Sequence, residues 1–304
     1  MEFFLEDNFT PKQVAAALKV SESSVKRWCD RGEIRSDRTI GGHRRIPLGL
    51  LLEFLESTNR RLVDPFAIGL EQLDGRISKP KPNMVDSPGL LGEFERALVS
   101  GTEVDCRRIM CHWFTTRGGI SSLADELIRP AFQAIGSAWK TGAVDIYEER
   151  HACEIIQRVV NELRRLIPEP SGMAPLAMGA TPSGDQYHLG TLLTDLVFRE
   201  SGWRTANLGS NIPFTSLLSA ARKHMPKVFW LSISHVEEEA AFLDKYAEFA
   251  KRLPKGVILI AGGQALNDQL RPKMVFSSNC DGMRQLSTFA KSLRESTLSK
   301  VSQN

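Results

Sequence analysis

The second half of the chain alternates short apolar runs with longer amphipathic stretches, and this alternation limits the possible folds more than any other feature. The apolar runs are PLAMGA, RTANLG, KVFWLSIS and GVILIAGG. The stretches with helical spacing are HLGTLLTDLVFRES, FTSLLSAARKH and EEEAAFLDKYAEFAKRL. Strands that alternate with helices form a parallel sheet covered on both faces. The sequence therefore predicts an α/β domain over residues 171–299.

Polar or glycine-rich segments follow each apolar run. They are TPSGDQYHLG, NLGSN, SISH and AGGQAL. Ligands of open parallel sheets bind at the carboxyl ends of the strands, where these segments would lie. None of them has the GxxxxGK[ST] or GxGxxG spacing of a phosphate-binding loop. We therefore expect a ligand groove of another kind at this edge.

A helical bundle is predicted before the α/β domain, over residues 89–170. Its apolar residues recur at intervals of three or four, which is typical of amphipathic helices. They are Leu91, Phe94, Leu98, Ile109, Met110, Trp113, Leu123, Leu127, Ile128, Ile155, Ile156, Val159, Val160 and Leu163. Residues 63–88 are rich in proline and show weak periodicity, so we interpret them as a linker.

Two short helices are predicted near the N-terminus. Thr10 has the position of an N-cap, with Pro11 next and Gln13 placed to complete a capping box. Ser21 begins the second helix, and Gly32 follows it as a C-terminal cap. Two helices joined by so tight a turn, the second with hydroxyls and cations at its start, are typical of a helix that enters the major groove. We interpret Trp28 as a core aromatic.

A basic hairpin follows the second helix. Ile34, Ile40 and Ile46 flank the turn Gly41-Gly42, a pattern typical of two short strands. Residues 22–45 hold seven Lys or Arg side chains against four Asp or Glu, a surplus equal to the net charge of +3 of the whole chain. Positive charge concentrated on one small domain favours nucleic acid as a partner.

The segment TPKQVAAALKVSESSVKRWCDRGEIRSDRTIGGHRRIPLGLLLEFL resembles the MerR family of winged helix-turn-helix regulators. The resemblance covers residues 9–57 and implies a DNA-binding domain at residues 1–62. It implies that the residues facing the major groove are Ser23, Ser24, Lys26 and Arg27. It also implies that the residues reaching backbone phosphates are Arg38, His43, Arg44 and Arg45.

The order of the three parts resembles that of light-sensing, cobalamin-dependent repressors of the CarH and LitR type. This resemblance implies a flavodoxin-like, cobalamin-binding α/β domain. The family pattern Asp/Glu-x-His-x-x-Gly, Ser-x-Ser and Gly-Gly would place the lower cofactor site at Asp185, Gly190, Ser232, Ser234, Gly262 and Gly263. The family motif Trp-x9-Glu-His would place the upper site at Trp139, Glu149 and His151.

Both motifs depart from the family at the histidine. Tyr187 stands where the cobalt-ligating histidine is expected, and His188 is one position late. In the bundle Arg150 follows Glu149, so His151 is again displaced by one. Three readings stay open: cobalamin binds base-on or with Tyr187 or His188 as the axial (metal) ligand; another small molecule or a protein partner replaces it; or the three bundle residues are ordinary surface and core residues.

We therefore expect a DNA-binding transcription regulator and not an enzyme. Its expected partners are double-stranded DNA, further copies of itself in a homo-oligomer, and cobalamin as adenosylcobalamin or a related form. A cobalamin carrier module of a methyltransferase is the less favoured alternative, because it needs no winged helix. No apolar run reaches the length of a membrane helix, and the acidic start MEFFLED is unlike a signal peptide, so we expect a cytoplasmic protein. Five cysteines without a CxxC pair predict reduced, mostly buried thiols.

Overall fold

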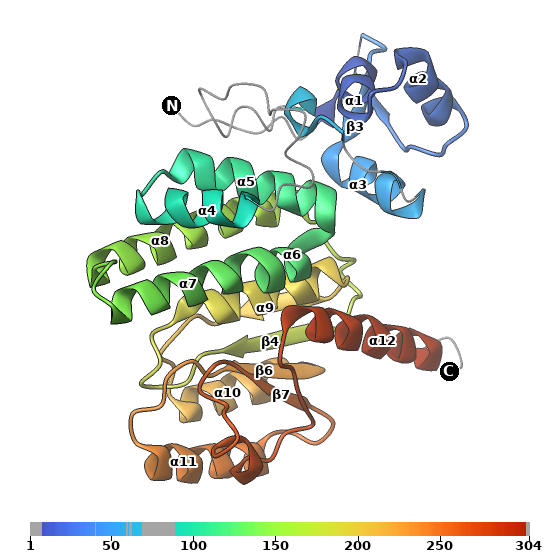
Figure 1. The fold of residues 1–304 in the computed structure, drawn as a ribbon. Helices are drawn as coiled ribbons and strands as arrows, with labels where there is room; N and C mark the ends of the chain where they lie inside the picture. Colours follow the sequence, from blue (N-terminus) through green and yellow to red (C-terminus); the bar gives the residue numbers. More distant parts are fainter. Residues whose placement is uncertain (1–7, 40, 59, 61–62, 69–88, 302–304) are drawn as a thin grey trace. The chain divides into compact units, whose positions relative to one another are not determined.

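The computed structural model describes residues 8–39, 41–58, 60, 63–68 and 89–301. It consists of two compact units, Met1–Pro168 and Glu169–Asn304 (Figure 1). Of the predicted linker, residues 69–88 lie outside the described residues. Its start packs on the first helix: Ala17 O accepts the backbone N–H groups of Val63 and Asp64 at 2.8 and 2.9 Å, and Ile68 is buried.

The N-terminal part combines helices with a three-stranded antiparallel sheet of order β1-β3-β2. Its elements are β1 (Asn8–Phe9), α1 (Pro11–Leu18), α2 (Glu22–Asp30), β2 (Asp37–Arg38), β3 (Arg44–Pro47), α3 (Leu48–Ser57) and the 3-10 turn η1 (Pro65–Ile68). Thr10 caps α1 in a full capping box with Gln13, and Ser21 caps α2, as predicted. Gly32 follows α2 with φ +73, a left-handed conformation that suits glycine. Strand β1 was not predicted.

The core of this part gathers residues from β1, β3 and the helices, and from the segment after α2. The fully buried members include Phe9, Val14, Val25, Ile34 and Ile46. Trp28 is half-buried, and the centroid of its ring lies 5.1 Å from that of Phe54. The guanidinium carbon of Arg60 lies over the Trp28 ring, 4.7 Å from its centroid. Its predicted core role thus holds in part, because one face of the ring is covered by an arginine.

The bundle contains five α-helices and one π-helical turn among the described residues. They are α4 (Leu90–Val99), α5 (Glu103–Arg117), α6 (Gly119–Ser122), the π-helix η4 (Leu123–Ile128), α7 (Arg129–Lys140) and α8 (Ile146–Leu163), and a 3-10 turn, η5 (Arg164–Leu166), follows. All of the predicted core residues are buried except Leu91, which is half-buried. Trp113 Nε1 donates to Ser122 Oγ at 3.1 Å inside this core, so its one polar atom is satisfied.

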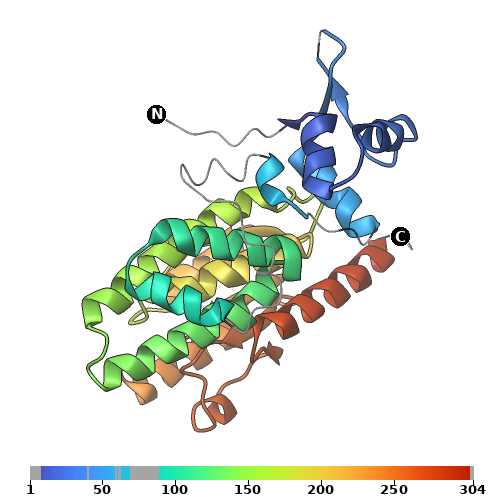
Figure 2. The ribbon, with the colours of Figure 1, turned by 45° about the horizontal axis from the view of Figure 1, so that its top comes forward.

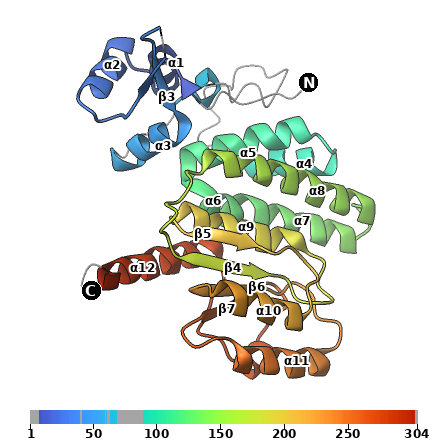
Figure 3. The same ribbon diagram turned by 180° about the vertical axis from the view of Figure 1, so that it is seen from behind.

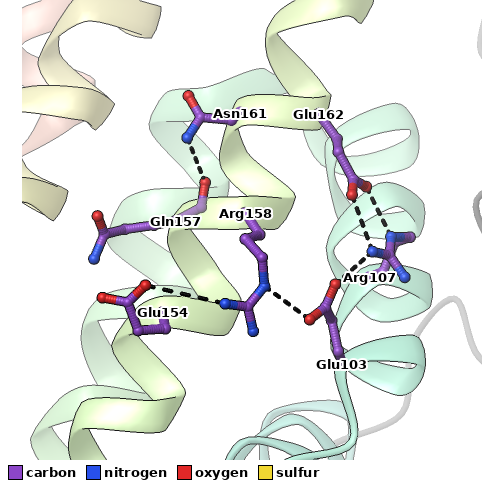
Figure 4. Close-up of polar contacts among 7 residues, drawn as sticks. All are labelled: Glu103, Arg107, Glu154, Gln157, Arg158, Asn161 and Glu162. Atoms are coloured by element: carbon purple, nitrogen blue, oxygen red, sulfur yellow. Dashed lines mark hydrogen bonds and ion pairs between the residues drawn. The ribbon is translucent and has the colours of Figure 1, made fainter. Parts of the chain in front are cut away.

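A network of ion pairs joins α5 to α8 (Figure 4). Arg107 donates to both carboxylate oxygens of Glu162 at 2.7 and 2.9 Å, and to Glu103 at 2.6 Å. Arg158 donates to the other oxygen of Glu103 at 2.9 Å and lies 4.0 Å from Glu154. The Arg107 side chain is 13% exposed, so this fork-shaped pair is shielded from solvent and fixes the relative position of the two helices.

The C-terminal unit is a five-stranded parallel sheet of order β5-β4-β6-β7-β8. Its strands are β4 (Leu176–Ala180), β5 (Arg204–Asn207), β6 (Val228–Ser232), β7 (Ile258–Gly262) and β8 (Ser278–Asn279). Its helices are α9 (His188–Glu200), α10 (Phe214–His224), α11 (Glu239–Arg252) and α12 (Met283–Val301), with a 3-10 turn, η6 (Arg271–Lys273), before β8. This strand order is flavodoxin-like, as predicted. Strand β8 and helix α12 were not predicted.

Each face of this sheet has its own core (Figure 3). Helices α10 and α11 cover one face, where Phe229 and Leu231 meet Phe242, Tyr246 and Phe249. Helices α9 and α12 cover the other face, where Phe198 stacks on Trp230 at 5.7 Å and Trp203 Nε1 donates to Ala290 O at 3.0 Å. Strands buried on both faces explain the continuous apolar runs in the sequence.

None of the described helices is long and apolar enough to cross a membrane. The five cysteines are free thiols; Cys106 and Cys111 are buried, and the other three are half-buried.

Candidate functional site

Helix α2 begins with a cluster of three serine hydroxyls. Ser21 Oγ accepts the backbone N–H of Ser24 at 3.2 Å and lies 2.8 Å from the hydroxyls of both Ser23 and Ser24. Ser23 is exposed and Ser24 is half-buried. That Ser23 and Ser24 face the major groove stays a prediction; the structure shows their hydroxyls beside that of Ser21 at the start of the helix.

Lys26 and Arg27 follow on the exposed side of α2. Lys26 Nζ pairs with Glu22 one turn earlier at 2.8 Å, and about half of the Lys26 side chain is exposed. A pair of this kind contributes only about 0.3–0.5 kcal/mol, so a phosphate can replace the carboxylate at little cost. The helix therefore offers mobile positive charge beside its capped start.

The predicted hairpin forms between β2 and β3. It protrudes from the helices of the N-terminal part, β1 to η1, which we call the head (Figure 2). Arg38 pairs in register with Arg44, and Thr39 N–H donates to His43 O at 2.9 Å. Gly42 has φ +76, as the turn requires. Arg38 and His43 are exposed and Arg45 is half-buried. Residue 40, whose isoleucine was predicted to flank the turn, lies outside the described residues.

Arg44 ties this hairpin to α2. Its side chain is 18% exposed, pairs with Asp30 and donates to Lys26 O at 2.8 Å. The hydrogen bond that Arg44 donates to the Asp30 carboxylate raises the pKa of Arg44. This bracing role was not predicted, because no local pattern signals it. The contact of Arg44 with a phosphate stays a prediction.

In the C-terminal unit, Asp185 joins two loops at the carboxyl edge of the sheet. It is fully buried, and Oδ1 accepts the backbone N–H of Tyr187 at 2.9 Å. Oδ2 accepts the backbone N–H groups of Ser234 and, at 3.2 Å, His235. Oδ1 thus organises the loop after β4, and Oδ2 holds that loop against the loop after β6.

Two glycines allow close approaches at the same edge. A Cβ atom on Gly190 would lie 2.5 Å from Ser232 Oγ and 3.9 Å from Ser234 Oγ. A Cβ atom on Gly263 would lie 2.2 Å from Ile233 O, and its φ of +125 also requires glycine. Gly262 O accepts the N–H of Ile233 at 2.7 Å. The structure therefore brings all six predicted residues of the lower cofactor site into one cluster.

Tyr187 and His188 occupy the start of α9. Tyr187 is the N-cap residue with 37% of its surface exposed, and His188 is the first helical residue and half-buried. Neighbouring positions at a helix start point in different directions, so the two side chains cannot present a donor atom at the same point.

The sequence analysis missed a buried polar chain beneath this cluster. Trp230 Nε1 donates to Thr191 Oγ at 2.9 Å, which donates to Asn207 Oδ1 at 3.1 Å. Asn207 Oδ1 also accepts the N–H of Gly209 at 2.9 Å. The available signal was the polar pair Thr191 and Thr194 among the buried apolar residues of α9. These hydrogen bonds connect β5, β6 and α9 beneath the cluster around Asp185.

The three predicted bundle residues do not form one cluster. Trp139 is 48% exposed near the end of α7. Glu149 is half-buried and accepts the Cys153 thiol at 3.4 Å. His151 is exposed and lies against Gly101, where an added Cβ would be 2.9 Å from the ring. Positions 149 and 151 are about 200° apart around an α-helix, so they face different sides.

Comparisons with known proteins cover both units. Residues 9–59 match the family model of the helix-turn-helix domain. The chain is 24% identical over 273 residues to the HTH-type transcriptional repressor CarA of Myxococcus xanthus, covering 88% of this chain and 89% of the relative. The predicted resemblance to CarH-type regulators is confirmed. The CarA-like match includes the head, the bundle and the α/β domain, because it leaves out only about a tenth of either chain.

The fold is also shared with a solved structure, the monomethylamine corrinoid protein of Methanosarcina barkeri. The TM-score is 0.58 at 12% identity, covering 67% of this chain and 98% of that chain. At this identity the likeness establishes the fold alone. It agrees with the flavodoxin-like, cobalamin-binding-like domain predicted from the sequence.

Proposed function

We propose that this chain is a transcription regulator that binds double-stranded DNA through its head and a corrinoid through its C-terminal unit, and that it acts without catalysis. The observation that carries the proposal is the braced winged helix-turn-helix: α2 with its capped start, the basic hairpin, and the Arg44 contact that joins them. The relative CarA is a transcriptional repressor of the same length range, which supports the same role.

In the proposed DNA complex, α2 enters the major groove and the hairpin lies along the backbone. Ser23, Ser24, Lys26 and Arg27 would face base edges and adjacent phosphates. Arg38, His43 and Arg45 would contact phosphates. A single head of this size binds weakly, so we propose that a homo-oligomer places several heads on repeated half-sites.

Four variants separate phosphate contacts from bracing. The probe is a duplex selected by the purified protein from a random-sequence library, and affinity is measured against salt concentration. Arg45→Ala should weaken binding and lower the salt slope by about 0.9, the value for one phosphate contact. Arg27→Ala should weaken binding to the selected duplex. An unchanged affinity and salt slope in both would refute the assignment.

Arg44→Ala and Asp30→Asn form the matched pair. Both remove the Arg44–Asp30 ion pair, but only Arg44→Ala removes the cation and its hydrogen bond to Lys26 O. If Arg44 acts by bracing, the two variants should weaken binding alike and keep the wild-type salt slope. If Arg44 contacts a phosphate, only Arg44→Ala lowers the slope.

The residues at the carboxyl edge fit a corrinoid groove in part. A Cβ on Gly190 would collide with Ser232 Oγ, and one on Gly263 would collide with Ile233 O, so α9 and the loop after β7 pack tightly against the end of β6. The position of the family's histidine holds Tyr187, whose phenol is a poorer neutral metal ligand than imidazole. We therefore propose that His188 would bind the metal, and that the residues clustered around Asp185 (Gly190, Ser232, Ser234, Gly262 and Gly263) would hold the rest of the group. A bound alkylcobalamin would supply a light-sensitive cobalt–carbon bond.

Asp185 has a fixed task in this proposal. Metal-bound histidines usually donate their second ring N–H to a carboxylate or a carbonyl. Both Asp185 oxygens already accept backbone N–H groups, so Asp185 acts by shaping the loop that carries His188. The bundle residues Trp139, Glu149 and His151, which the family motif names, stay a prediction.

The alternative is a regulator that senses another small molecule or a protein partner, and the exposed Tyr187 favours it. Titration with hydroxocobalamin and adenosylcobalamin in the dark, followed by absorption spectra, decides between them. Saturable binding whose spectrum changes in His188→Ala but not in Tyr187→Phe supports the proposal. Absence of binding would leave the DNA-binding assignment intact and remove the corrinoid.

Light and assembly are tested on the loaded protein. Gel filtration before and after illumination should show a change of oligomeric size if a cobalt–carbon bond is the switch. Equal size in both states would remove light from the proposal.

A further inference from the structure

An open hollow lies at the opposite edge of the α/β sheet from the cluster around Asp185. Its volume is about 300 Å³, and its lining includes Leu176 of β4 and Arg204 of β5 at the amino ends of their strands. The turns that lead into β6 and β7 complete it. A strand of five residues spans about 16 Å, so this cavity is separate from the cluster around Asp185.

Four basic residues, all of them exposed, line the cavity: Arg204, His224, Lys227 and Lys255. They come from three separate segments of the chain. Arg204 Nε donates to Ala174 O at 2.9 Å, a neutral acceptor that leaves its charge in place. None of the four takes part in an ion pair within the part of the chain that the structure describes, and no Asp or Glu occurs in residues 201–227. Three unneutralised cations around one hollow form a site of positive potential.

Helix dipoles do not explain this charge. Helices α10 and α11 both end near the cavity, and cations in a last turn offset the negative end of a helix. Each helix already has such cations in its last turn: Arg222 and Lys223 in α10, Lys251 and Arg252 in α11. Arg204, Lys227 and Lys255 lie outside the helices, and their charge is left for another partner.

The rest of the lining is apolar. Pro175, Leu176, Met225, Pro226 and Val257 contribute it, and Met225 is 58% exposed. Contacts with the phosphates of duplex DNA need no such surface, whereas small-molecule sites combine an apolar wall with a few polar groups and start at about this volume. An anion that carries a carbon skeleton uses both parts of the lining.

We propose that this cavity binds a small phosphorylated organic molecule. A phosphate monoester carries nearly two negative charges at neutral pH, which matches several convergent cations better than a carboxylate does. The phosphate lies among Arg204, Lys227 and Lys255, and the carbon skeleton lies against Met225 and Val257. The site is independent of the corrinoid proposal, because it uses none of the same residues.

The test uses the full-length protein with phenyl phosphate as the probe, and inorganic phosphate and a random-sequence 30-base-pair duplex as comparisons. Binding is measured by calorimetry. The test variant is Lys227→Gln/Lys255→Gln, and the matched control is Lys245→Gln/Lys291→Gln, which removes the same charge from exposed sites outside the cavity. Lys227→Arg/Lys255→Arg keeps the charge and checks that the fold is intact.

We expect phenyl phosphate to bind more tightly than inorganic phosphate, and the test variant to lose about tenfold or more in affinity. The control and the arginine variant should bind as the wild type does. Equal affinity in the test and control variants overturns the proposal. So does a result in which Lys227 and Lys255 affect duplex binding but phenyl phosphate does not bind, since the surface would then contact DNA.

Discussion

Replacing Gly190 by alanine tests the close approach of α9 to β6. Two opposing effects decide the result. Alanine inside a helix is favoured over glycine by about 0.8–1 kcal/mol. Against this, the new Cβ would lie 2.5 Å from Ser232 Oγ, so the serine must leave its position or the helix must shift. Overpacking of this kind costs about 1–3 kcal/mol.

The overlap is therefore the larger effect, and Gly190→Ala should lower the free energy of unfolding by roughly 1 kcal/mol. Ser232→Ala removes the colliding oxygen. The new Cβ would then be 3.7 Å from the Cβ of residue 232, an ordinary van der Waals distance. In that background, Gly190→Ala should stabilise the protein by roughly 0.5–1 kcal/mol. The sign of the effect should thus reverse.

Urea unfolding of the wild type, both single variants and the double variant forms a double-mutant cycle. The transition of the C-terminal unit can be followed by the fluorescence of the buried Trp203 and Trp230. Additive effects, or a stabilising Gly190→Ala in the wild-type background, would refute the packing argument. The cycle needs no bound ligand, so it tests the architecture of the groove independently of its occupant.

Three further predictions concern the bundle. Glu162→Gln should weaken the shielded pair with Arg107 and lower the free energy of unfolding by about 1–2 kcal/mol, a loss that Glu154→Gln on the exposed side should not reproduce. Burial, followed by the nearby Arg117 and Arg108, lowers the pKa of His112 below 6.5, so the unfolded state takes up its proton first. Stability should therefore fall as the pH drops below about 6.5, and His112→Gln should flatten this dependence in unfolding curves from pH 5 to 8; equal slopes would contradict it. Burial raises the pKa values of Cys106 and Cys153 to about 12, so iodoacetamide at pH 8 should label neither in the folded protein, as mass spectrometry of peptides can show.

Much of the fold could be predicted because its signals are local. The caps at Thr10 and Ser21 involve residues at most three positions apart, and the hairpin turn is specified by its glycines. The apolar runs from Pro175 onward showed strands buried on both faces. Strand β8 was not predicted because the segment SSNC is short and polar. Strand β1 was not predicted because two residues are too few to show an alternation of apolar and polar side chains.

The resemblance to known regulators placed the candidate residues but not their contacts. It indicated Asp185 as part of a cofactor motif, and the structure shows a buried carboxylate whose oxygens are taken by backbone N–H groups of its own loop and of the loop after β6. It indicated Arg44 as a phosphate contact, and the structure shows a brace to Asp30. Neither role has a signature in a single sequence.

The sequence by itself determined the periods, caps and turns, and through them the helix-turn-helix head, the bundle and the parallel sheet. Only the tertiary structure decided which distant side chains meet. Asp185 and Ser234 are 49 positions apart and become neighbours because β4 and β6 pair in the sheet. The basic cavity at the other edge arises in the same way, from three segments brought together by strand order. Local patterns depend on residues that are neighbours in the sequence. Such sites depend on which strands pair in the sheet, and this pairing is established only in the folded chain.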